Sequence, residues 1–271
     1  MPPHNEQFPS VAQAALLLLA NFLLEYIIGV LFYDFRGTVG VTSAQAQALV
    51  VLLANGIVLV SVMHYRGMGY RDLVHPAKAS IPVTLLLLLP PVFLLVPLVL
   101  LLDHQLMLLV QQLIPMSRWE EQAFTRMVAA NLPTVVAACV LAPVLEEMLF
   151  RGVLLRAFLQ KYPRWAAISY SALLFGAAHL NVYQFLFASA LGLLLGWLYE
   201  RSRSLLPCIA LHAAVNTTIV MLEATKASPG EEVLSDASVA LWLGAALAAI
   251  AGGLALRRLL VGTSRRSTDT A

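Results

Sequence analysis

The sequence is short of charged residues, because only 12% of its 271 residues are Asp, Glu, Lys or Arg, whereas 60% are hydrophobic. A soluble domain carries about 25% charged residues and cannot bury so much apolar surface. The net charge of +2 lacks the basic excess typical of nucleic-acid-binding proteins. With a mean hydropathy of +0.80, the composition predicts an integral membrane protein without a nucleic-acid partner.

Cysteine is equally scarce, since only Cys139 and Cys208 occur and both lie in apolar runs. They predict packing residues, and no disulfide framework or thiolate metal site is indicated. Several catalytic signatures are also missing from the sequence: His-Glu-x-x-His, a pair of intramembrane aspartates, Gly-x-Ser-x-Gly, and a glycine-rich phosphate loop. Their absence argues against the corresponding hydrolases and nucleotide-binding enzymes.

Long apolar runs dominate what is present. A membrane span needs roughly 20 predominantly apolar residues, and eight candidates satisfy that requirement approximately. They predict an all-α, polytopic membrane helix bundle around a buried polar cavity, formed by a single domain of residues 1–271. The predicted spans are 11–33, 44–63, 80–102, 132–154, 166–182, 184–199, 205–222 and 237–260.

The predicted fifth and sixth spans are short and meet with little loop sequence between them, so we expect a tight helical hairpin. Residues 65–79 mix basic and apolar side chains and are expected at the cytoplasmic interface. Residues 104–127 are expected to form an amphipathic or re-entrant segment on the outer side. The polar tail after Val261 is expected to be frayed.

The basic residues predict an orientation in the membrane. Of the seventeen Lys and Arg residues, twelve fall on one side of the predicted spans, four fall on the other, and Arg151 lies within a span. Because cytoplasmic loops carry the excess of Lys and Arg, both termini are predicted to be cytoplasmic. The expected location is the cytoplasmic (inner) membrane.

Three ionisable residues interrupt the fourth span. Such side chains cost about 2.5–3.5 kcal/mol each at the membrane centre, so they persist where they pair, face a protein interior or carry a function. Glu147 and Arg151 are four residues apart and share a helix face, with the acid before the base. We expect these two to neutralise each other and brace the helix. Glu146 points to another face, where it can present a carboxylate to a buried cavity.

Two later spans add histidines and an amide. His179 follows Phe175 by one turn, and His212 precedes Asn216 by one turn. A single intramembrane His or Asn is more often a hydrogen-bonded contact between helices than a catalyst. Phe175 by itself predicts packing.

Asn21 and Glu25 of the first span are also one turn apart and predict a local structural pair. The catalytic hypothesis rests on a different set. A carboxylate, two imidazoles and a carboxamide on three spans are the groups that a water-activating site needs.

The ordered motifs Glu146-Glu147-x-x-x-Arg151, Phe175-x-x-x-His179 and His212-x-x-x-Asn216 resemble those of the CAAX-protease and bacteriocin-processing family. That family consists of intramembrane endopeptidases and includes the type II CAAX prenyl endopeptidases. The resemblance is concentrated in residues 143–217, which would form the catalytic core. It implies an eight-helix bundle around a conical cavity, in which a peptide bond of a membrane-associated or lipidated protein or peptide is hydrolysed.

The resemblance also implies roles for individual residues. Glu146 would be the base that acts on water together with His179, while His212 and Asn216 would line an oxyanion pocket. A zinc-dependent version with Glu146, His179 and His212 as ligands fits the same residues. We expect no metal, because Asn216 is a better oxyanion donor than zinc ligand and no carboxylates are apparent beside the histidines.

Two other functions stay open at this point. A membrane immunity or regulatory protein could keep the fold and act by binding a partner. A proton-coupled carrier could use the buried polar groups as a relay, although no internal repeat supports it. The pairs Gly192 with Gly196 and Gly252 with Gly253 could serve packing inside the bundle or dimerisation.

Overall fold

The computed structural model describes residues 8–127, 131–225 and 237–261, and every regular element in them is helical. Seven of these helices are long and apolar enough to cross a membrane. The prediction of an all-α, polytopic membrane protein is therefore confirmed. The seven helices span Val11–Thr38, Ser43–Arg66, Val96–Leu113, Leu132–Lys161, Val182–Ser202, Leu206–Ala224 and Val239–Val261.

The helices fall into two compact units that alternate along the chain. The first unit comprises Met1–Val74 and Asn131–Gly196, and the second comprises His75–Ala130 and Trp197–Ala271. The expected catalytic core of residues 143–217 is divided between them at residue 196. The catalytic role of residues 143–217 stays a prediction. The assignment of residues 1–271 to a single domain also stays a prediction.

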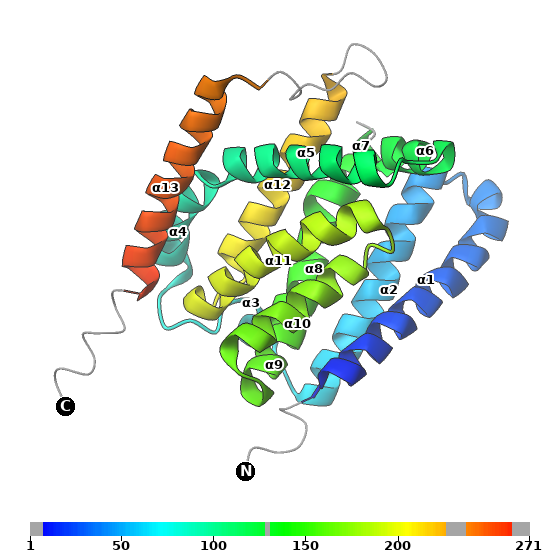
Figure 1. Ribbon diagram of the computed structural model, residues 1–271. Coiled ribbons are helices and arrows are strands. Elements are labelled where there is room, and N and C mark those ends of the chain that lie inside the picture. The colour runs from blue at the N-terminus through cyan, green and yellow to red at the C-terminus, as the bar shows by residue number, and fades with distance from the viewer. Residues whose placement is uncertain (1–7, 128–130, 226–236, 262–271) are drawn as a thin grey trace. The chain divides into compact units, whose positions relative to one another are not determined.

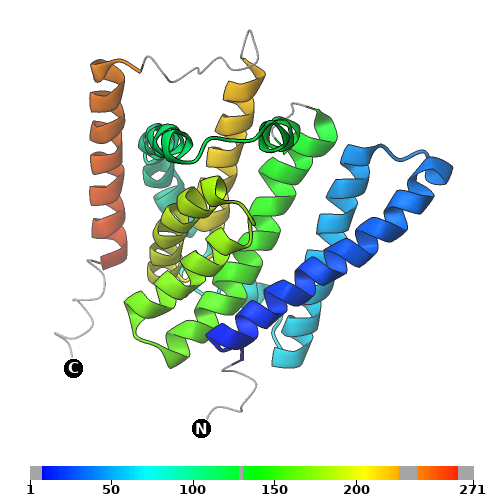
Figure 2. The ribbon, with the colours of Figure 1, turned by 45° about the vertical axis from the view of Figure 1, so that its right-hand side comes forward.

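The first unit begins with two helices that lie side by side in antiparallel directions, α1 (Val11–Val39) and α2 (Ser43–Arg66) (Figures 1 and 2). Ser10 and Thr42 cap their N-termini, each accepting a hydrogen bond from a backbone N–H three residues later. Gly40 ends α1 with a φ of 69°, a left-handed conformation that glycine adopts without steric cost. The short helix α3 (Tyr70–Val74) follows α2.

A long helix over Leu132–Lys161 forms the centre of the first unit and packs against α2. It changes its winding along its length, because two π-helical segments interrupt the α-helix. Pro143 is the second residue after the first of them and has no N–H to offer the preceding turn. The successive segments are α7 (Leu132–Val136), η2 (Ala137–Leu141), α8 (Ala142–Glu147), η3 (Met148–Leu155) and α9 (Arg156–Lys161).

The predicted hairpin is present as α10 (Arg164–Ala177) and α11 (Val182–Ser202). The predicted span 166–182 is wrong in its length, because α10 has only 14 residues and ends at Ala177. His179 therefore lies in the turn between the helices and not inside a span. The early end of α10 was not expected, because the turn contains neither glycine nor proline.

Glycines allow α10 and α11 to approach closely. A Cβ atom on Gly192 would lie 3.0 Å from the Cα of Ala172, and one on Gly196 would lie 3.0 Å from the Cγ2 of Ile168. The pair Gly192 and Gly196 thus serves packing within the first unit, one of the two uses that the sequence left open.

The second unit corrects the predicted span 80–102. The chain forms α4 (Ile81–Phe93), bends, and continues as α5 (Val96–Leu113), as Figure 1 shows. Pro90, Pro91 and Pro97 cluster at the bend, and each lacks the backbone N–H that a continuous helix requires. Residues 104–113, expected to begin an amphipathic or re-entrant segment, instead continue α5.

The remaining helices of the second unit are α6 (Arg118–Met127), α12 (Leu206–Ala224) and α13 (Val239–Val261). Both α12 and α13 pack against α4 and α5. Gly252 closely approaches α4, since a Cβ atom there would lie 2.5 Å from the Pro91 carbonyl oxygen, whereas Gly253 has no such neighbour. The expected frayed tail after Val261 lies outside the described residues.

Candidate functional site

Glu147 and Arg151 form the predicted ion pair. Their side chains are 0% exposed, and Arg151 Nη1 donates to Glu147 Oε1 at 2.8 Å. Glu147 ends α8 and Arg151 lies in η3, so the pair spans the junction between α-helical and π-helical winding. Each charge at this depth would be costly alone, and the contact offsets that cost. The bracing pair inferred from the sequence is therefore present.

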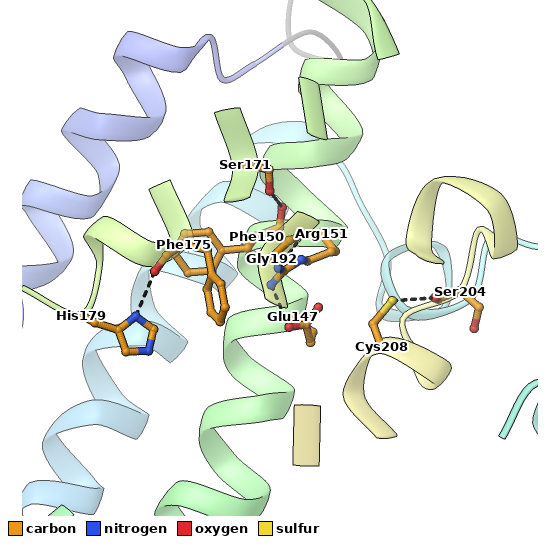
Figure 3. Close-up of polar contacts among 9 residues, drawn as sticks. All are labelled: Glu147, Phe150, Arg151, Ser171, Phe175, His179, Gly192, Ser204 and Cys208. Carbon is orange, nitrogen blue, oxygen red and sulfur yellow. Dashed lines mark hydrogen bonds and ion pairs between the residues drawn. The ribbon is translucent and has the colours of Figure 1, made fainter. Parts of the chain in front are cut away.

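Arg151 also ties its helix to α10 and α11. Its Nη2 donates to the backbone carbonyl of Gly192 on α11 at 3.3 Å. Its guanidinium carbon lies 4.4 Å from the ring centre of Phe175 on α10, within range of a cation–π interaction. Figure 3 shows these contacts around one side chain. Arg151 thus connects three helical segments of the first unit.

Phe175 links this buried pair to His179. The two rings meet edge to face with centroids 5.3 Å apart, and Phe175 meets Phe150 in the same way at 5.1 Å. Ser171 donates its hydroxyl hydrogen to the carbonyl of Phe150 at 2.9 Å, which fixes η3 against α10. Phe175, which the sequence alone predicted as packing, therefore supports both Arg151 and the imidazole (Figure 3).

The backbone determines the tautomer of His179. Its Nδ1 lies 3.0 Å from the carbonyl oxygen of Phe175. A carbonyl only accepts hydrogen bonds, so Nδ1 carries the hydrogen in this contact. In the neutral imidazole, Nε2 then has a lone pair that can accept a proton, hold water or bind a metal. The side chain is partly exposed.

The residues after His179 lock the turn that follows α10. Asn181 Nδ2 donates to the His179 carbonyl at 2.9 Å and to Gln184 Oε1 at 2.6 Å. Asn181 Oδ1 accepts the backbone N–H of Gln184 at 2.8 Å, which caps the N-terminus of α11. The position of His179 is consequently held from both sides.

Glu146 is partly exposed, in contrast to its neighbour Glu147. It lies close enough to Glu25 of α1 for the two carboxylates to interact electrostatically. Glu25 Oε1 accepts hydrogen bonds from Asn21 Nδ2 at 2.8 Å and from Asn55 Nδ2 at 3.0 Å. The predicted pairing of Asn21 with Glu25 is confirmed, and the first unit places it near Glu146.

His212 and Asn216 belong to α12 in the second unit. They are one helical turn apart, with His212 only 3% exposed and Asn216 partly exposed. On the same helix, Ala214, Thr218 and Leu222 line a cavity of about 490 Å³ together with residues of α4, α5 and α13. At 100° per residue these three lie on a face of α12 away from His212 and Asn216. The apolar cavity is therefore separate from the polar face of α12.

Residues 128–218 match the family model described as type II CAAX prenyl endopeptidase Rce1-like. This segment contains all three motifs, and the resemblance predicted from them is confirmed.

A stretch of 102 residues is 27% identical to a protein of Bacillus subtilis (strain 168) named "Putative membrane peptidase YdiL". The match covers 38% of this chain and 42% of that protein, which is less than half of either. No solved structure gives a significant match.

Residues 128–218, called here the Rce1-like segment, thus contain every catalytic or supporting residue that the sequence predicts. In the first unit the structure links Glu147, Arg151, Phe175 and His179 by direct contacts. Among the residues that the structure describes, neither unit contains a group of three His, Cys, Asp or Glu side chains that could hold a metal ion.

Two features of the Rce1-like segment and its neighbours were not predicted. The first is the proximity of Glu25 to Glu146, although an ionisable residue inside a span is by default a functional candidate. The second is the carbonyl that supports His179. The sequence shows no carboxylates beside the histidines, yet a backbone carbonyl supports a metal-binding or catalytic imidazole equally well.

Proposed function

We propose that this protein is an intramembrane endopeptidase that hydrolyses a peptide bond with a water molecule activated by Glu146 and His179. The match of residues 128–218 to the Rce1-like endopeptidases carries the proposal. The geometry of the first unit supports it: Glu147 is paired with Arg151 and fully buried, while Glu146 and His179 are partly exposed.

In the proposed reaction, Glu146 is the general base. Its carboxylate takes a proton from water while the water oxygen attacks the carbonyl carbon of the peptide bond. His179 assists through Nε2, which accepts a hydrogen bond from the same water because Nδ1 is held by Phe175. The proton then passes from Glu146 to the leaving amine as the carbon–nitrogen bond breaks.

We assign His212 and Asn216 to stabilisation of the negative oxygen that forms during the attack. An imidazole N–H and a carboxamide NH₂ are both suitable donors to an oxyanion. Removing one such donor costs about 10²–10³ in kcat. This assignment rests on the motif and on the chemistry of the two side chains.

We propose that the reaction needs no metal, and we retain a zinc-dependent version as the alternative. In that version Glu146, His179 and His212 would be the ligands. His179 suits either version, because its Nε2 is the available nitrogen and its Nδ1 has the backbone partner that zinc-binding histidines commonly have. Zinc would supply Lewis acidity and a more acidic water.

The chain is a multi-pass membrane protein, and its substrate is proposed to be a protein or peptide held in or at the membrane. A prenylated or otherwise lipidated substrate is the finer form of this proposal, taken from the name of the matching family. We further propose that both termini face the cytoplasm and that the host membrane is the inner membrane, because of the distribution of Lys and Arg.

The proposal is tested by cleavage of a quenched fluorescent peptide library, with and without lipidated members, by purified protein in detergent. Wild type, Glu146→Gln and His179→Gln are compared, and Glu121→Gln in the exposed helix α6 is the matched control. Each is assayed with and without a zinc chelator. Cleavage is expected for wild type and the control, and a loss of about 10²–10⁴-fold is expected for Glu146→Gln.

Each outcome has a definite meaning. Activity that resists the chelator but not Glu146→Gln supports the metal-free reaction, whereas loss with both supports the zinc version. Substantial activity in Glu146→Gln overturns the role of this residue. If wild type cleaves no member of the library, the endopeptidase proposal fails and the binding or regulatory function gains weight.

A further inference from the structure

Leu180 has an unusual conformation directly beside the candidate catalytic histidine. Its φ is 56°, in the left-handed region, and its side chain is 73% exposed. A non-glycine residue in this region is uncommon, and for a bulky side chain it is an outlier. Such conformations persist where the surrounding structure enforces them, and they concentrate at functional sites.

The surrounding contacts show what enforces the conformation. The backbone N–H groups of His179 and Leu180 donate to the carbonyls of Gly176 and Ala177 at 3.1 and 3.2 Å, which closes the end of α10. On the other side, Asn181 bonds to the His179 carbonyl and caps α11. These contacts close the turn without using the side chain of Leu180.

Glycine or asparagine at position 180 would make the same turn at lower cost, since both adopt the left-handed conformation readily. The leucine side chain is thus unnecessary for the turn. It also contributes little to the core, because most of its surface is exposed. What it adds is an exposed aliphatic side chain on the residue that follows His179, whose imidazole is held in place by Phe175.

We propose that Leu180 is a specificity-determining residue, whose side chain contacts an apolar side chain of the bound peptide next to the bond that is cleaved. The inference rests on the proposed endopeptidase function. Losing a small apolar contact in a binding pocket lowers kcat/KM about 10–200-fold for the substrate that uses it. For a substrate with a polar residue at that position, loss of the Leu180 side chain should change kcat/KM little.

The test compares Leu180→Gly, Leu180→Met and Leu186→Ala. Leu186 is also an exposed leucine but lies within helix α11, so it is the matched control. Each protein is assayed on two peptides that differ only in an apolar or polar residue beside the cleaved bond, and thermal unfolding is recorded. Leu180→Gly should be at least as stable as wild type, yet lose about tenfold or more of its preference for the apolar peptide.

Leu180→Met and Leu186→Ala should keep the preference. An equal fall on both peptides, or a lower unfolding temperature in Leu180→Gly, would mean that Leu180 only shapes the turn, and the inference would be wrong. The same holds if Leu180→Gly retains the preference in full.

A binding measurement separates this inference from the proposed reaction. A photoreactive amino acid is placed at position 180 or 186 in the Glu146→Gln protein, and cross-linking to the apolar peptide is measured. Cross-linking from 180 but not from 186 supports the contact even if no variant cleaves the peptide, in which case only the endopeptidase proposal fails. Cleavage by wild type without cross-linking from 180 overturns the contact alone.

Discussion

Glu146 and Glu147 are chemically identical neighbours, yet the structure gives them opposite surroundings. Glu147 is fully buried and bonded to Arg151, whereas Glu146 is partly exposed and near a second carboxylate, that of Glu25. One residue along a helix turns a side chain by 100°, which here separates a structural contact from a candidate reactive group. The difference teaches that position on the helix face, and not residue type, decides the role.

The largest effect is expected from breaking the buried pair. Arg151→Ala leaves the Glu147 carboxylate in a buried site without its main cation, and such losses cost about 3–5 kcal/mol. Chemical denaturation in detergent measures the change, and a double variant with Glu147→Ala should lose less than the sum of the two single losses. A loss below about 1 kcal/mol in Arg151→Ala would contradict the bracing role.

The two glutamates can be compared directly by the same substitution. Glu147→Gln weakens a charged hydrogen bond and should cost about 1.5–3 kcal/mol of stability. Glu146→Gln should change stability by about 0.5 kcal/mol or less, because the side chain is partly exposed, while it abolishes peptide cleavage. The comparison fails if both variants have the same stability, or if Glu147→Gln alone loses activity at unchanged stability.

Gly192 tests the buried region without altering any charge. A Cβ atom there would lie 3.0 Å from Ala172 Cα and 3.3 Å from Arg151 Nη2, so Gly192→Ala should cost about 1–3 kcal/mol. Gly56→Ala is the control, because that position has no atom within 4 Å and should gain about 0.5–1 kcal/mol. Equal unfolding temperatures for the two variants would disprove the close approach of α10 and α11.

Phe175 joins the two regions and should affect both. Phe175→Leu removes the aromatic ring that contacts both Arg151 and His179. Loss of the cation–π contact with Arg151 should lower the stability by about 1–2 kcal/mol. We therefore expect lower stability together with lower kcat in the cleavage assay. Reduced stability with wild-type kcat would show that the ring serves Arg151 alone.

Glu120 is a solvent-facing reference for Glu146 and Glu147. Its carboxylate accepts the backbone N–H and hydroxyl hydrogens of Ser117, and these bonds lower the pKa of Glu120. Because the pKa of Glu120 is lower in the folded state, its ionised carboxylate stabilises α6 at pH values above the pKa of an unfolded glutamate. This stabilisation disappears as the pH falls through the pKa of Glu120 in the folded state. The protection of the α6 amides against hydrogen exchange, relative to their intrinsic exchange rates, should decrease below that pH, and Ser117→Ala should decrease it at neutral pH.

A large part of the architecture could be predicted because it depends on local properties. Long apolar runs predict spanning helices whatever their neighbours are, and the four-residue spacing of Glu147 and Arg151 predicts a shared face. The failures had local causes too. Prolines divide the run 80–102 into α4 and α5, and the turn at His179 ends α10 early without a glycine.

The sequence by itself determined the helical membrane class, the motifs and the ion pair, since composition and helical periodicity suffice for each. Only the tertiary structure decided which groups meet across helices. It brings the Phe175 ring between Arg151 and His179, places Glu25 near Glu146 and holds Leu180 in a left-handed turn. These contacts depend on close packing between segments distant in the chain, which no periodicity within a single helix encodes.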